Sequence, residues 1–227
     1  VERPQYRALT AEQAQSLLRA VEGHRNEALY VLALTVGMRQ GELLGLRLGE
    51  FDAQAGTLAV TGNLQRTGGR WELAETKVHR ASAVIHLPRM AAEALLSKLD
   101  LREAERVEAA DWWEDCGLVF TTQAGAPIHR RDLLREFHEL AAAADLPPMR
   151  FHDLRHSAAS LLLAEGVPAR EVAELLGHRN VRTTLDTYSH VLPAMRPRLA
   201  GRIQRMLGGH GAASSIASKP PGREVSG

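Results

Sequence analysis

The sequence predicts a mainly helical α+β protein in which a small antiparallel sheet is inserted among the helices. Helical patterns occupy the first 46 residues, short β-type runs occupy residues 51–87, and helical patterns return after Pro88. Apolar residues spaced three or four apart predict helices, whereas short β-branched runs bounded by glycine predict strands. With 227 residues, of which 44% are hydrophobic and 24% charged, the chain is long enough to bury a core.

The first helices are marked by their ends. Thr10 followed three residues later by Gln13 predicts a capping box, and the helix continues to Gly23. A second helix over residues 27–36 is predicted to be buried, because its residues are apolar on every side.

A glycine then separates the second helix from a third. Gly37 interrupts the helical pattern, which resumes from about Met38 to Leu46. Arg39 therefore lies at a helix start.

The predicted sheet has short runs at residues 58–61, 71–73 and 83–87, with a glycine-rich turn at residues 67–70. Further helices are expected at roughly 88–107, 129–144, 154–165, 168–176, 181–188 and 194–207. Pro168 suits the first position of its helix, and Gly177 suits the left-handed residue that ends it. After Leu207 the composition turns to Gly, Ala, Ser and Pro, so residues 208–227 are expected to form a mobile tail.

The stretch "FHDLRHSAAS" places His152, Arg155 and His156 within five positions, which suits either a metal or an anion. Asp153 is a good N-cap, which would leave His152 outside the helix and not on one face with His156. Arg155 would also repel a dication, so a zinc hydrolase is disfavoured. Cations at a helix start suit a bound anion, although a single arginine more commonly pairs with a structural carboxylate.

Composition limits the class of protein. The sequence holds no apolar run of membrane-spanning length, and its first residues do not resemble a signal peptide. Cys116 is the only cysteine, so an internal disulfide and a cysteine-rich zinc site are excluded. A single cysteine suits a reducing compartment. We therefore expect a cytoplasmic protein without a membrane partner.

The net charge of +1 is unevenly distributed. Residues 101–116 carry six acids against two arginines, whereas residues 176–206 carry six arginines against Asp186. The second segment is either a solvated helical surface or part of a basic face that binds nucleic acid.

Four separated stretches resemble, in order and spacing, the boxes of the tyrosine recombinase (phage integrase) catalytic domain. They are "TVGMRQGELLGL" at 35–46, "HDLRHS" at 152–157, "LLGH" at 175–178 and "TTLDTYSHV" at 183–191. The combination of an Arg, a His-x-x-Arg, a Leu-Gly-His and a Tyr ten residues later is specific. The resemblance implies the fold of that domain over residues 1–207, and it identifies the anion as a DNA phosphate.

The resemblance also implies a role for each matching residue. Arg39 and Arg155 would bind the scissile phosphate, which suits the planar guanidinium fork. Tyr188 would be the nucleophile, with His152 as its base or orienting group and His178 as a donor to a phosphate oxygen. Glu42 would support the site. Lys77, in the expected hairpin, is the candidate general acid, while His156 and His190 are interpreted as structural.

The implied reaction is site-specific recombination through a 3′-phosphotyrosine intermediate, without a metal, another cofactor or ATP. An unperturbed phenol is only about one part in a thousand ionised at pH 7, so Tyr188 would depend on the surrounding cations. The expected partners are double-stranded DNA attachment sites and further copies of the chain in a homo-tetramer; accessory DNA-bending or directionality proteins are compatible with this role. A type IB topoisomerase and a non-catalytic DNA-binding protein are the alternatives.

Two expectations concern the C-terminal and N-terminal ends of the chain. Apolar residues recur at helical spacing from Leu192 to Leu207, with Arg198, Arg202 and Arg205 between them, so this segment is a candidate for packing on a neighbouring subunit. Relatives usually carry an N-terminal core-binding domain, which this chain is expected to lack. We therefore expect weak, strongly salt-dependent DNA binding.

Overall fold

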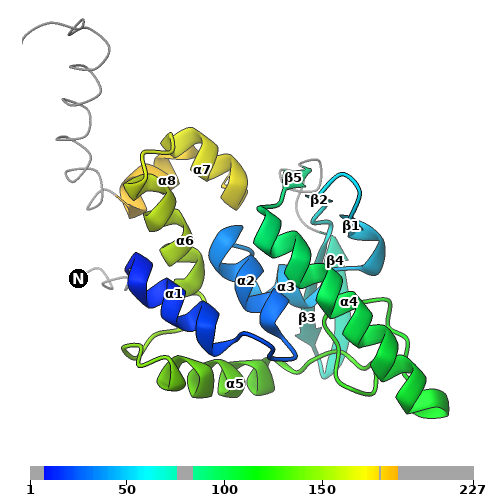
Figure 1. Cartoon of the computed structure of the whole chain (residues 1–227). Coiled ribbons are helices and arrows are strands. Elements are labelled where there is room, and N and C mark those ends of the chain that lie inside the picture. The colour runs from blue at the N-terminus through cyan, green and yellow to red at the C-terminus, as the bar shows by residue number, and fades with distance from the viewer. Residues whose placement is uncertain (1–7, 76–83, 179, 189–227) are drawn as a thin grey trace, which may run out of the picture.

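The computed structural model describes residues 8–75, 84–178 and 180–188. Helices and strands follow the predicted order, with the strands between the third and fourth helices (Figure 1). The helices are α1 (Ala11–Ala20), α2 (Glu27–Thr35), α3 (Gln40–Leu44), α4 (Arg89–Ala109), α5 (Arg130–Ala143), α6 (Asp153–Ala164), α7 (Ala169–Leu176) and α8 (Val181–Thr187), with 3-10 turns η1 (Leu48–Glu50) and η2 (Ala110–Trp112). The strands are β1 (Phe51–Asp52), β2 (Thr57–Leu58), β3 (Gly62–Thr67), β4 (Arg70–Glu75) and β5 (Ile85–His86).

Helix α2 forms the centre of the core. Its residues from Ala28 to Leu34 are all buried, as predicted for a helix that is apolar on every side. It contacts α1, α3, α4 and α6. In Figure 1, α6–α8 gather at one end and the strands at the other, with α2 and α3 between them.

The strands in the described part of the chain form two antiparallel sheets rather than one. β1, β2 and β5 make a three-stranded sheet, while β3 and β4 pair with each other, from Gly62 opposite Glu75 to Thr67 opposite Arg70. Of the predicted run at 58–61, only Leu58 lies in a strand, and the other residues connect β2 to β3. The glycine-rich turn is confirmed, since Gly68 and Gly69 both have positive φ.

Close backbone contact joins α3 to β3. A Cβ on Gly45 would lie 2.7 Å from the Leu64 backbone nitrogen, and one on Gly62 would lie 2.6 Å from the Gly45 carbonyl oxygen. Since these neighbours are backbone atoms, a side chain would force the two elements apart. The helix that follows Arg39 is thereby held against the hairpin.

Replacing Gly45 with alanine is therefore expected to destabilise the protein by about 1–3 kcal/mol, the usual cost of overpacking. Gly49→Ala is the matched control, because a Cβ at Gly49 would meet no atom within 4 Å. Urea denaturation of both variants measures the difference. Equal stability of the two variants would contradict the proposed contact.

A buried cation lies under α4. The side chain of Lys98 is 1% exposed, its Nζ lies 3.9 Å from Glu105 Oε2, and within the described chain it has no hydrogen-bond partner. Burial and the positive charge of Arg25 lower the pKa of Lys98 from 10.5 to about 8. Glu105 already accepts two hydrogen bonds from the Arg25 guanidinium, so it remains paired without Lys98.

Lys98→Met is expected to stabilise the protein at pH 7, by roughly 1–3 kcal/mol, because it removes a buried charge. Between about pH 8 and 10.5, Lys98 of the wild type is mainly protonated in the unfolded chain but mainly neutral in the folded protein. Lys98 therefore makes the free energy of unfolding rise with pH over this range. The gain from Lys98→Met should shrink over that window. Urea denaturation at several pH values measures this difference in stability. Arg89→Met is the control, because the Arg89 side chain is 90% exposed. A Lys98→Met protein that is less stable than the wild type at pH 7 would contradict the prediction.

Several predicted helix ends are confirmed, and others shift. The Thr10–Gln13 capping box is present, and Gly177 ends α7 with φ 67°. Pro168 is the N-cap of α7 rather than its first residue. The prediction that Asp153 is an N-cap is wrong: Asp153 is the first residue of α6, and its carboxylate accepts hydrogen bonds from the Arg150 backbone and side chain.

No helix among the described residues is long and apolar enough to cross a membrane. The predicted helix at 194–207 and the tail at 208–227 lie outside the described residues.

Candidate active site

Three of the predicted boxes meet at the buried guanidinium of Arg155. Its Nη1 donates to the Gly37 carbonyl and its Nη2 to the Leu176 carbonyl, both at 2.6 Å. Gly37 has φ 64°, and a Cβ there would lie 2.5 Å from Leu176 Cδ2, so only glycine suits this position. The two bonds fix the plane of the guanidinium where α2, α6 and α7 meet.

Arg39 is held by Glu42, one helical turn later. Glu42 is buried, and its carboxylate accepts hydrogen bonds at 2.8 Å from both the backbone and Nη1 of Arg39. The Arg39 side chain is 45% exposed. Glu42 therefore orients a guanidinium that faces solvent.

Tyr188 lies at the end of α8 with its ring in a small apolar cluster. The cluster also contains Ala159, Leu163, Val172 and Leu176. The Tyr188 side chain is buried, with 2% of its surface exposed. Its hydroxyl oxygen lies 2.8 Å from Nδ1 of His156. His156, interpreted from the sequence as structural, thus contacts the atom that would act as nucleophile.

The two histidines of the FHDLRHSAAS stretch lie side by side. His152 is outside α6, as predicted, but the expected separation from His156 is wrong, because the rings meet edge to face at 5.0 Å. Partial desolvation and the charge of Arg155 lower the pKa of His152. Burial and the neighbouring His152 lower the pKa of His156 to about 4. Both rings are therefore mainly neutral at pH 7.

His178 follows directly after the end of α7. The Gly177 backbone N–H donates to Glu174 and that of His178 to Ala173, which is the pattern of a Schellman motif. The His178 ring is half-buried, and its Nδ1 lies 2.8 Å from the Thr184 hydroxyl oxygen. The third and fourth boxes are joined by this contact.

A pocket of about 930 Å³, here called the basic groove, lies beside Arg39 and His152. Among the residues that the structure describes, none that lines this groove is acidic. Its cationic and imidazole lining comprises Arg39, Arg66, Arg130, Arg150, His129, His138 and His152. Arg66, from β3, lies 5.7 Å over the Trp71 ring and 2.7 Å from His129 Nε2. The groove thus combines the hairpin, α5 and two of the predicted boxes.

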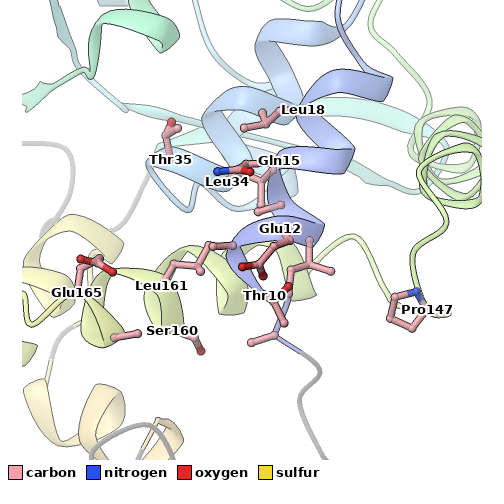
Figure 2. A pocket seen from close by; sticks show the side chains of 15 residues that line it. Thr10, Glu12, Gln15, Leu18, Leu34, Thr35, Pro147, Ser160, Leu161 and Glu165 are labelled. Atoms are coloured by element: carbon pink, nitrogen blue, oxygen red, sulfur yellow. The ribbon is translucent and has the colours of Figure 1, made fainter. Parts of the chain in front are cut away.

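A second hollow, of about 940 Å³, is here called the apolar groove. Figure 2 shows Leu18 from α1, Leu34 from α2 and Leu161 from α6 around it. Two exposed carboxylates, Glu12 and Glu165, also line it.

The remaining sequence candidates have different outcomes. Lys77 and His190 lie outside the described residues. Within residues 8–75, 84–178 and 180–188, no three His, Cys, Asp or Glu side chains are grouped so as to hold a metal ion.

Sequence reasoning missed the contacts of His156 and most of the basic groove. The sequence does contain a signal for Arg130 and Arg150. Each lies at or just before the start of a helix, as Arg39 does, and that position suits a cation that binds an anion. For Arg66 the sequence gives no signal, since a lone arginine in a hairpin is usually only a solvated charge.

Comparison with known proteins gives a family match over most of the chain. The model of the phage integrase family matches residues 7–195. A "Tyrosine recombinase XerC-like" protein of Caldanaerobacter subterraneus is 31% identical over 82% of this chain and 50% of its own length. An "Integrase" of Saccharopolyspora erythraea is 29% identical over 89% of this chain and 58% of its own. The chain thus spans about half the length of these curated relatives.

Solved structures share the fold. The Tn1549 transposon integrase, in complex with transposon right end DNA, superposes with a TM-score of 0.74 at 20% identity, covering 92% of this chain and 68% of that one. The XerH site-specific recombinase, bound to its difH substrate after cleavage, gives a TM-score of 0.62 at 22% identity, covering 88% and 54%.

Proposed function

Because the chain belongs to the phage integrase family, we propose that it is the catalytic domain of a site-specific DNA recombinase with Tyr188 as its nucleophile. The observation that carries this proposal is the meeting of four distant boxes. Arg155 bonds to Gly37 and Leu176, His156 contacts Tyr188, and His178 contacts Thr184. The relatives named above are recombinases and integrases, which favours recombination over topoisomerase activity.

In the proposed reaction, Tyr188 Oη attacks the scissile phosphorus, the phenol proton leaves, and the bond from phosphorus to the 5′ oxygen breaks. The products are a 3′-phosphotyrosine bond and a 5′ hydroxyl. Since the covalent bond keeps the phosphodiester energy, a 5′ hydroxyl of another strand can reverse the step and religate without ATP.

Each side chain of the site has a proposed role. Arg39, oriented by Glu42, and Arg155, oriented by two carbonyls, bind the non-bridging phosphate oxygens. His178 donates to a phosphate oxygen, and His152, mainly neutral at pH 7, accepts the phenol proton or orients the phenol. Lys77, as general acid, would protonate the 5′ oxygen.

Tyr188 is buried. The phenol is too enclosed to meet a phosphate where it lies. We therefore propose that DNA binding turns the Tyr188 side chain out of the apolar cluster and breaks its contact with His156.

Double-stranded DNA is the proposed partner of the basic groove. Four arginines line it, and none of its described lining residues is acidic, so a phosphate backbone would meet positive charge and no carboxylate among them. DNA affinity should then fall with salt, with a log–log slope of about −3 to −4 for some four phosphate contacts.

The groove assignment is tested by removing one exposed arginine. Arg130→Ala should reduce the magnitude of the salt slope by about 1 and leave sequence preference unchanged. Arg170→Ala, at an 81% exposed side chain on α7, is the matched control. If the magnitude of the salt slope fell equally in both variants, the DNA would not be bound in the basic groove.

We further propose that the chain acts as a homo-tetramer on DNA, soluble in the cytoplasm. The apolar groove suits the segment 192–207 of a neighbouring copy, because that segment combines leucines with arginines and the groove combines leucines with Glu12 and Glu165. Deleting residues 193–227 should then abolish self-association on DNA in analytical ultracentrifugation, and an unchanged assembly would contradict this docking.

A further inference from the structure

We propose that Thr184 fixes the tautomer of His178, by donating its hydroxyl hydrogen to Nδ1 and so placing the ring proton on Nε2. Thr184 is then a positioning residue for the site, acting through His178. The consequence for cleavage rests on the proposed function, whereas the tautomer itself does not.

The burial of Thr184 supports this direction of the hydrogen bond. Its exposed fraction is 0%, and within the described part of the chain its hydroxyl has one hydrogen-bond partner, His178 Nδ1 at 2.8 Å. If Nδ1 carried the ring proton, the buried hydroxyl hydrogen would have no acceptor there, which is unfavourable. A neutral imidazole with an accepting Nδ1 carries its proton on Nε2.

Two other hydroxyls on helices of this protein behave differently. Thr35 donates to the Val31 carbonyl and Ser157 to the Asp153 carbonyl, each four residues earlier, as is common for Ser and Thr within helices. The Thr184 hydroxyl turns away from its own helix toward the His178 ring. Its side chain is therefore used between elements rather than within α8.

The main chain of Thr184 extends the connection to the nucleophile. Its carbonyl accepts the backbone N–H of Tyr188 at 3.0 Å. One residue thus contacts His178 through its side chain and Tyr188 through its backbone.

The proposed role of His178 requires a proton on Nε2. A protonated Nε2 can donate a hydrogen bond to a phosphate oxygen, whereas an unprotonated nitrogen would repel that oxygen.

The tautomer is measured directly by nitrogen NMR of the histidine-labelled full chain at about pH 8, where an unperturbed imidazole is neutral. The His178 signals should show an unprotonated Nδ1 and a protonated Nε2. A protonated Nδ1 in the wild type would overturn the proposal, whether or not any variant folds.

Two variants test the consequence for the proposed reaction. Thr184→Val keeps the shape but removes the hydroxyl, so it should lose the fixed tautomer and slow single-turnover cleavage by about 10- to 100-fold, with DNA affinity unchanged. Thr184→Ser keeps the hydroxyl and should restore both. A Thr184→Val protein with the wild-type tautomer, or with the wild-type cleavage rate, would overturn the positioning role. If the wild type itself formed no DNA adduct, the proposed function would fail while the tautomer measurement still stood.

Discussion

Tyr188→Phe is expected to abolish the covalent protein–DNA adduct completely, because it removes the one oxygen proposed to attack phosphorus. DNA affinity should stay within a few-fold of the wild type, since Tyr188 is buried and is not among the residues that line the basic groove. Loss of the contact with His156 should cost only about 1 kcal/mol of folding stability. Denaturing gel electrophoresis after incubation with nicked DNA measures the adduct.

Tyr30→Phe is the matched control for this substitution. Tyr30 is also buried, and its hydroxyl donates to Glu136 at 2.8 Å, so the same chemical change removes a hydrogen bond to a residue outside the four boxes. The control should keep the adduct. Adduct formation by Tyr188→Phe would show that another group is the nucleophile.

The second large effect is expected for Arg39. Arg39→Lys keeps the charge but loses the planar fork, and Arg39→Ala loses both. The cleavage rate of Arg39→Ala should fall by about 100- to 1,000-fold, the range found when one donor to a developing oxyanion is removed. Arg39→Lys should recover only part of this loss.

The Arg39 effect is measured as the single-turnover rate of adduct formation at saturating DNA, so that weaker binding does not contribute. Arg170→Ala, the exposed arginine on α7, should cleave at the wild-type rate. An Arg39→Lys protein at the wild-type rate would mean that a point charge suffices and that the orientation imposed by Glu42 has no catalytic role.

Much of the site could be predicted because its boxes are local. Arg39 and Glu42 share one helical turn, and His152 and Arg155 flank one helix start. Local signals also predicted the Thr10 capping box and the left-handed Gly177. Such features depend on a few adjacent residues, so propensity and spacing determine them.

The rest depends on contacts between distant segments. The basic groove joins Arg66 of β3, Arg130 of α5 and Arg150 of the loop before α6, and nothing in the spacing of these residues predicts their meeting. The contact between His156 and Tyr188 spans 32 positions. The division of the strands into two sheets follows from the packing of β3 against α3, which strand propensity does not report.

The covalent linkage itself tests the central proposal most directly. The chain is incubated, in the presence of a chelator, with nicked duplex fragments from the DNA around its gene, and the bound fragments are recovered after SDS and sequenced from both ends. We expect DNA joined to Tyr188 through its 3′ phosphate, with a free 5′ hydroxyl on the released strand. Linkage through a 5′ phosphate, or no SDS-resistant adduct from protein that binds the same fragments, would contradict it.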